Sequence, residues 1–165
     1  MPRQIEMDEI EAIAATISSD PLGLVHHQPE AWARPRCCFD NVWKKVNLSG
    51  GRTRYGWTFH ARIKEGTGEY IFITHHAVWN SRDGRLIDVT PFHEDPTHHP
   101  LLIGGSVLFL VDNKAEPVVK GAVIAPLPLR YFPRGDDEGI AKYVQEMNDK
   151  EHQDLTSLIN TLDRP

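Results

Sequence analysis

Apolar residues recur at helical spacing in three parts of the chain. Residues 4–18 form one amphipathic stretch, residues 38–48 form a second, and a C-terminal region covers residues 136–162. Either Asp136 or Asp137 is suited to cap the last of these, because a short acidic side chain accepts hydrogen bonds from the unpaired N–H groups at a helix start. The pattern therefore predicts a helix near each end of the chain and one helix between them.

Other stretches are rich in β-branched and aromatic residues, a composition typical of strands. They lie at residues 54–63, 69–79, 85–90, 106–111 and 118–124. Asp83-Gly84 lies between the second and the third of these stretches and predicts a tight hairpin turn. The segments 21–36, 91–105 and 126–133 contain several prolines and show little periodicity, so they are expected to be loops.

The order of these segments indicates the class of fold. Successive strands that follow a helix favour an antiparallel sheet packed on that helix, here with further helices at both ends of the chain. A chain of 165 residues, of which 40% are hydrophobic, is long enough for one domain with a core. The sequence therefore predicts a single α+β domain over residues 1–165, with its core in residues 36–124.

Charge and cysteine content narrow the range of partners and compartments. The formal net charge of -5, without a basic stripe, argues against a nucleic-acid partner. No segment approaches the roughly 18 apolar residues of a membrane span, and no apolar signal sequence is visible at the N-terminus. The two cysteines are adjacent, so a bridge between them would be strained and free thiols are expected. A cytoplasmic protein is predicted, although export without a signal peptide would leave the same pattern.

Cys37 and Cys38 stand where the middle helix is expected to begin. The unpaired N–H groups and the positive dipole end at that place favour the thiolate, which is the reactive form of cysteine. Cys38 is the better candidate nucleophile, because it begins the apolar stripe and Val42, one turn later, would hold that face against the sheet. Cys37 is then expected to point elsewhere. The alternative is that both thiols are small buried residues without chemistry.

A candidate base and a candidate orienting group follow along the chain. His75 and His76 lie in a predicted strand and face opposite sides of it, so either is a possible base. Asp88 lies in an apolar context in the next predicted strand and therefore needs a partner. If those strands pair across the hairpin, Asp88 comes within reach of His76 and can orient its ring. The alternative is that Asp88 caps a turn at Thr90-Pro91.

These residues belong to longer motifs, which can be compared with known families. They are Cys38-Phe39-Asp40, Gly50 to Trp57, His76-Ala77-Val78-Trp79 and Asp88-Val89-Thr90-Pro91. Their order resembles the core of the transglutaminase-like branch of the papain-like fold. It also resembles a group of uncharacterised bacterial proteins that continue with Phe-Leu-x-Asp, here residues 109–112. The resemblance implies Cys38 as the nucleophile, His76 as the base and Asp88 as the group that orients the base.

The resemblance also implies an activity. It is that of a cysteine-dependent hydrolase or acyltransferase that acts on an amide or ester in a peptide, a protein or a small amide, without a cofactor. The acceptor of the acyl group, water or an amine, is left open. Members of this superfamily usually have a glutamine or tryptophan upstream as the oxyanion-hole residue, for which Gln28 and Trp32 are candidates. Asn41 is expected only to pack or cap the helix start.

Two other functions compete with catalysis. The first is a metal site, because His93, His98 and His99 crowd one loop and zinc accepts histidine ligands, although no standard zinc spacing is present. The second is a binding module of the same fold that has lost its chemistry. In that case tryptophans and the Pro-rich segments 125–128 and 132–133 would line a groove for a partner.

Overall fold

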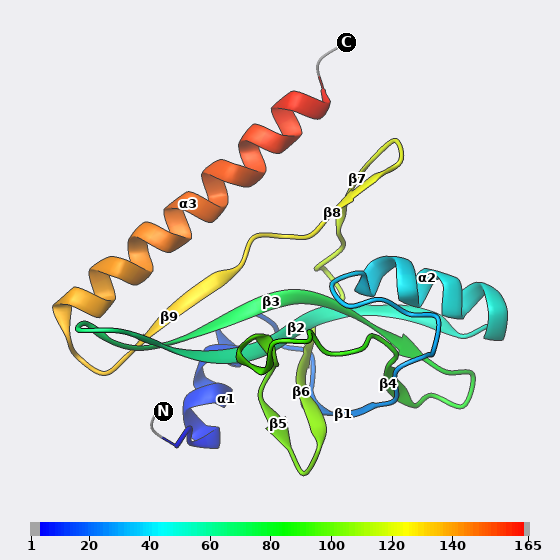
Figure 1. Ribbon diagram of the computed structural model, residues 1–165, viewed down its shortest axis with the longest axis horizontal. Helices are drawn as coiled ribbons and strands as arrows, with labels where there is room; N and C mark the ends of the chain where they lie inside the picture. The colour runs from blue at the N-terminus through cyan, green and yellow to red at the C-terminus, as the bar shows by residue number, and fades with distance from the viewer. Residues whose placement is uncertain (1–3, 164–165) are drawn as a thin grey trace.

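The two longest strands form the centre of the fold. In the computed structural model, which describes residues 4–163, β2 (Arg52–Lys64) and β3 (Gly68–Asn80) pair antiparallel along their full length (Figure 1). The hairpin turn between them contains Gly66, whose φ of 71° lies in the left-handed region that glycine adopts without strain. This twisted pair carries His76 and several other residues of the candidate site.

The other strands extend this pair and close it into a ring. They are β1 (Leu22–His27), β4 (Leu86–Asp88), β5 (Leu102–Ile103), β6 (Ser106–Val111) and β9 (Arg130–Arg134). The order of the sheet is β1-β4-β3-β2-β6-β5, and β1 also pairs with β6, so five of the strands form a small closed barrel. β1 runs parallel to β4, with His26 opposite Ile87. The sheet is therefore mixed, and the prediction of an antiparallel sheet is corrected at this strand.

Three α-helices lie beside the sheet within residues 4–163. They are α1 (Met7–Ala15), α2 (Cys38–Ser49) and α3 (Glu138–Leu162), and a short 3-10 helix, η1 (Pro96–His98), lies in the long loop before β5. In Figure 1, α1 lies below the central strands, α2 lies above them, and α3 runs away from the sheet beside β9. The class of fold is thus α+β, as the sequence predicts.

The odd-numbered side chains of β3 pack against the helices, and the even-numbered ones lie on the other face of the strand. Ile71 and Ile73 pack with α1 in one buried cluster, while Ala77 packs with Cys38 and Val42 of α2 in another. These odd-numbered residues share one face of the strand, and the even-numbered residues point to the other. Thr74 and His76 therefore project away from the packed face, into the cleft described below.

Several predicted elements are confirmed. The middle helix begins at Cys38, the strand at 106–111 has the predicted bounds, and the C-terminal helix is a single α-helix. Asp137 is its cap, because its side chain accepts hydrogen bonds from the N–H groups of Gly139 and Ile140. The first helix is shorter than predicted at both ends.

Four loop or strand predictions are corrected by the structure. The segment 21–36 contains β1, and the segment 126–133 leads into β9, where Pro133 is tolerated because β9 is an edge strand. The loop 91–105 contains the short strand β5, which pairs with β6. The predicted strand at 118–124 is instead a hairpin of β7 (Val118–Lys120) and β8 (Val123–Ala125), because Gly121 has a φ of 58° and turns the chain.

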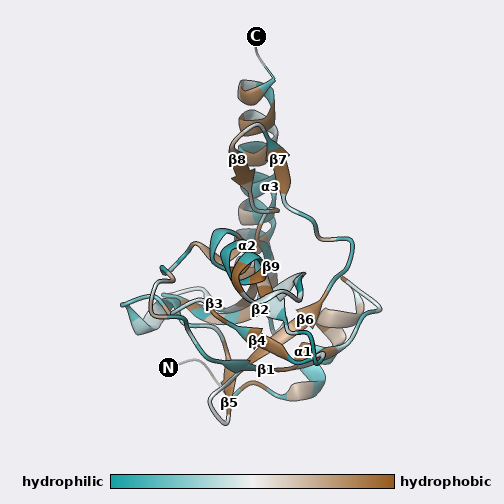
Figure 2. Cartoon of the chain, turned by 90° about the vertical axis from the view of Figure 1, so that its right-hand side faces the viewer, coloured by the Kyte–Doolittle hydropathy of each residue, from teal (hydrophilic) through white to brown (hydrophobic). Residues whose placement is uncertain are grey.

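Some hydrophobic segments are buried in the core, and others are exposed on the surface. Figure 2 shows β6 and the β7–β8 hairpin as strongly hydrophobic. Residues Val107 to Leu110 of β6 are buried, whereas Val119 in the hairpin is 60% exposed. Of the helices in residues 4–163, none combines the length and the hydropathy needed to cross a membrane.

Candidate active site

Cys38 is the first residue of α2, the place that the sequence predicts for it. The residue before it, Cys37, is the N-cap and provides no side-chain cap, so no side chain blocks the N–H groups of the first turn. Cys38 is 7% exposed and packs against Val42 and Ala77, yet it also lines the cleft. Cys37 lines the same cleft and is more exposed, so the expectation that it points elsewhere is wrong.

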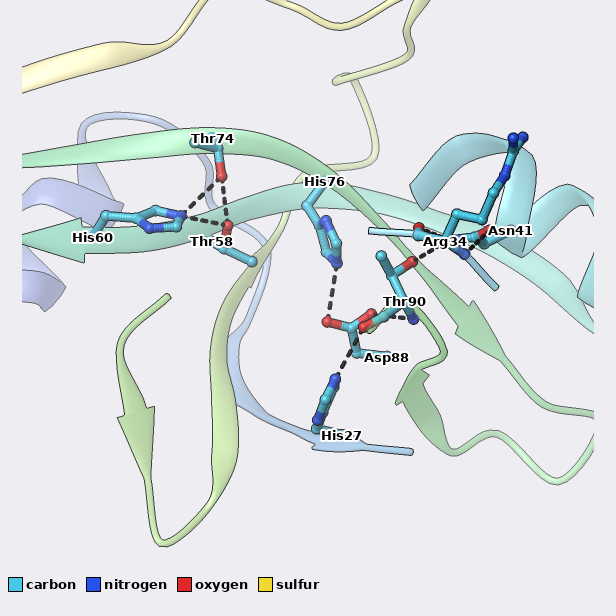
Figure 3. A network of polar contacts seen from close by, with 9 residues as sticks. All are labelled: His27, Arg34, Asn41, Thr58, His60, Thr74, His76, Asp88 and Thr90. Carbon is cyan, nitrogen blue, oxygen red and sulfur yellow. Dashed lines mark hydrogen bonds and ion pairs between the residues drawn. The ribbon is translucent and has the colours of Figure 1, made fainter. Parts of the chain in front are cut away.

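His76 and Asp88 are in direct contact. Nε2 of His76 lies 3.1 Å from Oδ2 of Asp88, and both side chains are largely buried (Figure 3). The other carboxylate oxygen of Asp88 accepts a hydrogen bond from the backbone N–H of Thr90 at 3.0 Å. The two predicted roles of Asp88, orienting the histidine and capping the turn, are therefore performed together, one by each oxygen.

The surroundings of His76 favour its protonated form. Burial of the ring lowers its pKa, but the charges of Asp88 and Cys38 outweigh burial, so the pKa of His76 is raised well above 6.5. Because Asp88 occupies Nε2, the ring nitrogen that remains for the Cys38 thiol is Nδ1. Cys38, His76 and Asp88 all line the same cleft.

His75 has a different role from its neighbour. Its Nδ1 accepts a hydrogen bond from the N–H of Leu127 at 2.9 Å, so Nε2 carries the proton and donates it to the carbonyl of Ala115 at 2.6 Å. Burial lowers the pKa of His75 to about 4. His75 is therefore a neutral residue that anchors the segment between β6 and β9, whereas His76 contacts Asp88.

The strand that carries His76 has an open edge. β3 pairs with β9 as far as Ile73, and with β4 from Trp79 onward. Between these points, in the part of the chain that the structure describes, only β2 is paired with β3. The start of α2 lies at this gap, because Cys38 packs against Ala77 and the ring of Phe39 lies 4.9 Å from that of His75. The start of α2 therefore lies beside the part of β3 that carries His75 and His76.

Asn41 connects the helix of Cys38 to the strand of Asp88. Its side-chain amide donates to the carbonyl of Arg34 at 2.8 Å and to the hydroxyl of Thr90 at 3.1 Å, while its oxygen accepts from the N–H of Arg34. The sequence predicts only packing or capping at the helix start for Asn41, and not its bond to Thr90. Its position one turn after Cys38 was the available signal, but its partner Thr90 lies far along the chain.

A cleft of about 450 Å³ joins these residues. Its floor includes Thr58, Thr74 and His76, and the loop after β4 contributes Phe92 and His93 to its wall. The oxyanion-hole candidates Gln28 and Trp32 do not belong to its lining, and Trp32 instead lies under the ammonium group of Lys44 at 4.4 Å. The candidate triad thus lies in a cavity of the size that small ligands or a short peptide segment occupy.

The histidines of the loop after β4 bond mainly to nearby backbone. Nδ1 of His93 accepts from the N–H of Asp95, and Nε2 of His99 lies 2.7 Å from the carbonyl of His93. His98 lies 3.8 Å from the carboxylate of Asp95. Within residues 4–163, no group of three or more histidine, cysteine or acidic side chains is arranged to hold a metal ion.

Comparisons with known proteins add no relative: no protein family model matches the chain, and no curated protein or solved structure is significantly similar to it.

Proposed function

We propose that this protein is a cysteine-dependent hydrolase or acyltransferase that acts on an amide or an ester, with a core of the papain-like, transglutaminase-like type. The observation that carries the proposal is the 3.1 Å contact between His76 and Asp88, with Cys38 beside the same imidazole. A nucleophile, a base and a group that orients the base are the components of thiol catalysis.

The proposed reaction proceeds in two stages. His76 takes the proton of the Cys38 thiol, and the thiolate attacks the carbonyl carbon of the substrate. The C–N or C–O bond of the tetrahedral intermediate then breaks, His76 returns its proton to the leaving group, and a thioester to Cys38 remains. Water or an amine, deprotonated by His76, attacks this thioester and releases the acid or the new amide together with the free thiol.

Two features of the site support these steps. The raised pKa of His76 means that the proton taken from the thiol is held at neutral pH, and Asp88 stabilises the charged ring. The N–H groups of the first turn of α2, which no side chain caps, are available to the oxyanion beside Cys38. The protein therefore does not need the side chain of Gln28 or Trp32 for charge stabilisation.

The proposal is tested by measuring thiol reactivity between pH 5 and pH 9. Intact-protein mass spectrometry with iodoacetamide, followed by peptide mapping, gives a separate rate for each cysteine. We expect Cys38 to react at pH 6 faster than a free thiol, and this excess to disappear in His76→Ala but persist in His75→Gln. If Cys38 reacts no faster than N-acetylcysteine over the whole range, the protein is an inert binding module rather than a thiol enzyme.

A further inference from the structure

A second group of polar side chains lies in the floor of the cleft beside the candidate triad. The hydroxyls of Thr58 and Thr74 are 2.6 Å apart, and Nε2 of His60 lies 3.3 Å from the first and 3.1 Å from the second. All three residues line the cleft. Figure 3 shows the two threonines and His76 projecting from the same side of the β2–β3 pair.

The proton on His60 is fixed by its surroundings. Nδ1 lies 3.1 Å from the carbonyl of His99, which can only accept, so Nδ1 carries the proton and donates it. Burial and the nearby charge of Arg62 lower the pKa of His60 to about 3, so the ring is neutral at physiological pH. Its Nε2 is consequently a hydrogen-bond acceptor that faces the two hydroxyls.

Counting protons shows what this cluster offers to a ligand. Thr58 and Thr74 have one hydroxyl proton each. One threonine donates its hydroxyl proton to Nε2 of His60, and the other threonine donates its proton to the oxygen of the first. The count is the same whichever threonine takes each place. Both protons are therefore used inside the cluster. What remains for a ligand are oxygen lone pairs, so the cluster accepts hydrogen bonds and does not donate them.

The spacing between the cluster and His76 corresponds to two positions along an extended chain. Thr74 precedes His76 by two positions on β3, and Thr58 lies directly opposite Thr74 on β2. Two residues of a strand span about 7 Å. Consider an extended peptide in which the carbonyl of one residue is attacked. The N–H of the preceding residue lies at a similar distance from that carbonyl.

From these observations we propose that the Thr58–His60–Thr74 cluster is a substrate subsite that accepts a hydrogen bond from an amide N–H of a peptide-like acyl donor. This inference rests on the proposed function, because it places the attacked carbonyl at Cys38. It deepens that function by naming the substrate class: an acyl group with a backbone N–H one residue away from the reacting carbonyl. A simple fatty acyl ester has no donor at that position.

Two affinity labels that differ only at this N–H test the inference. The probes are acetyl-glycyl-glycine chloromethyl ketone and acetyl-sarcosyl-glycine chloromethyl ketone, whose first residue carries a methyl group on nitrogen. Second-order rates of alkylation of Cys38 are measured by intact-protein mass spectrometry, and N-acetylcysteine gives the intrinsic ratio of the two reagents. In the wild type we expect the N–H probe to react about 5- to 10-fold faster than the intrinsic ratio predicts, the effect of one hydrogen bond.

Variants of Thr58 and Thr74 separate a hydrogen bond from a steric effect of the methyl group. The double variant Thr58→Val, Thr74→Val keeps the shape of both side chains but removes both accepting oxygens, so the preference for the N–H probe should fall to the intrinsic ratio. Thr74→Ser keeps the hydroxyl and should keep the preference. Circular dichroism and thermal unfolding verify that each variant is folded, and the comparison of the two probes in the wild type does not depend on any variant.

The outcomes distinguish this inference from the proposed function. Equal corrected rates for the two probes in the wild type, or a preference that survives in the double variant Thr58→Val, Thr74→Val, overturn the subsite even when iodoacetamide shows a reactive, His76-dependent Cys38. A Cys38 that reacts with iodoacetamide no faster than N-acetylcysteine overturns the proposed function, and the subsite with it.

Discussion

Asn41 donates a hydrogen bond to the hydroxyl of Thr90 at 3.1 Å, and this contact joins the helix of Cys38 to the turn after Asp88. Asn41 is 4% exposed and also holds both backbone polar groups of Arg34. A single side chain thus links three segments of the candidate site. The link adds to the pairing of β4, which is only three residues long, in holding the start of α2 beside Asp88.

Asn41→Ala should therefore destabilise the protein. The substitution leaves the buried hydroxyl of Thr90 and the partly buried backbone groups of Arg34 without these hydrogen bonds, a loss of about 1–3 kcal/mol in the free energy of unfolding. Urea unfolding followed by circular dichroism measures this change. Asn47 lies on the same helix and is exposed, so Asn47→Ala is the matched control and should change stability by less than about 0.5 kcal/mol. Equal effects of the two substitutions would contradict the role given to Asn41.

The two adjacent cysteines should differ sharply in turnover. Cys38→Ala should abolish hydrolysis of an amide or ester substrate, because it removes the atom that forms the thioester. Cys37→Ala should retain most of the activity, although Cys37 lines the same cleft. The measurement is product formation by both variants on a panel of peptide amides and aryl esters. Equal tolerance of both substitutions would remove Cys38 as the nucleophile.

Asp88→Asn should lower the pH at which the ring of His76 loses its proton. The negative charge of Asp88 raises the pKa of His76, so removing the charge makes the imidazolium less stable. NMR titration of the histidine ring signals measures this pKa directly. Asp83 lies in the exposed turn between β3 and β4, and Asp83→Asn should leave the titration of His76 unchanged. In a turnover assay, Asp88→Asn should cost orders of magnitude, as for comparable aspartates.

His75 should make the protein sensitive to acid. Its pKa is lowered from 6.5 to about 4, so the unfolded chain binds a proton in this interval that the folded protein does not bind. Stability is consequently lost as the pH falls below 6.5, by up to about 1.4 kcal/mol per pH unit for one such group. His60, with a pKa of about 3, adds to the same effect.

His75→Gln should reduce the slope of stability against pH between pH 6.5 and pH 4. Urea unfolding at several pH values in this interval measures the slope for each variant. His26 is exposed at the end of β1, and His26→Gln should leave the slope of the wild type intact. A slope that is the same in His75→Gln and in the wild type would show that His75 is not neutral in the folded protein.

The sequence predicts the parts of the site that depend on local signals. Asp83-Gly84 identifies a hairpin, and the two-residue period of its strands brings Asp88 within reach of His76, as the structure confirms. The start of α2 at Cys38 follows from a helical pattern that begins there. The choice between His75 and His76 does not follow from local signals, since it depends on Ala115 and Leu127, which lie far along the chain.

The parts of the fold that were not predicted depend on distant partners. β1 has no alternation of polar and apolar residues, and it is a strand because both β4 and β6 pair with it. β9 contains Pro133 and its pairing with β3 leaves the strand at an edge, so its sequence favours irregular chain. In both cases tertiary pairing overrides the local preference.

Closure of the barrel affects the order in which and the rate at which this chain folds. Leu22, near the start of the chain, pairs with Leu110, which is synthesised much later. Contacts between remote segments slow folding, because the entropy of the intervening loop is lost before the contact forms. The β2–β3 hairpin can form early by itself, but β4, which carries Asp88, gains its parallel neighbour only when β1 docks between β4 and β6. A nascent chain should therefore bring Asp88 into its final position late, when the barrel closes.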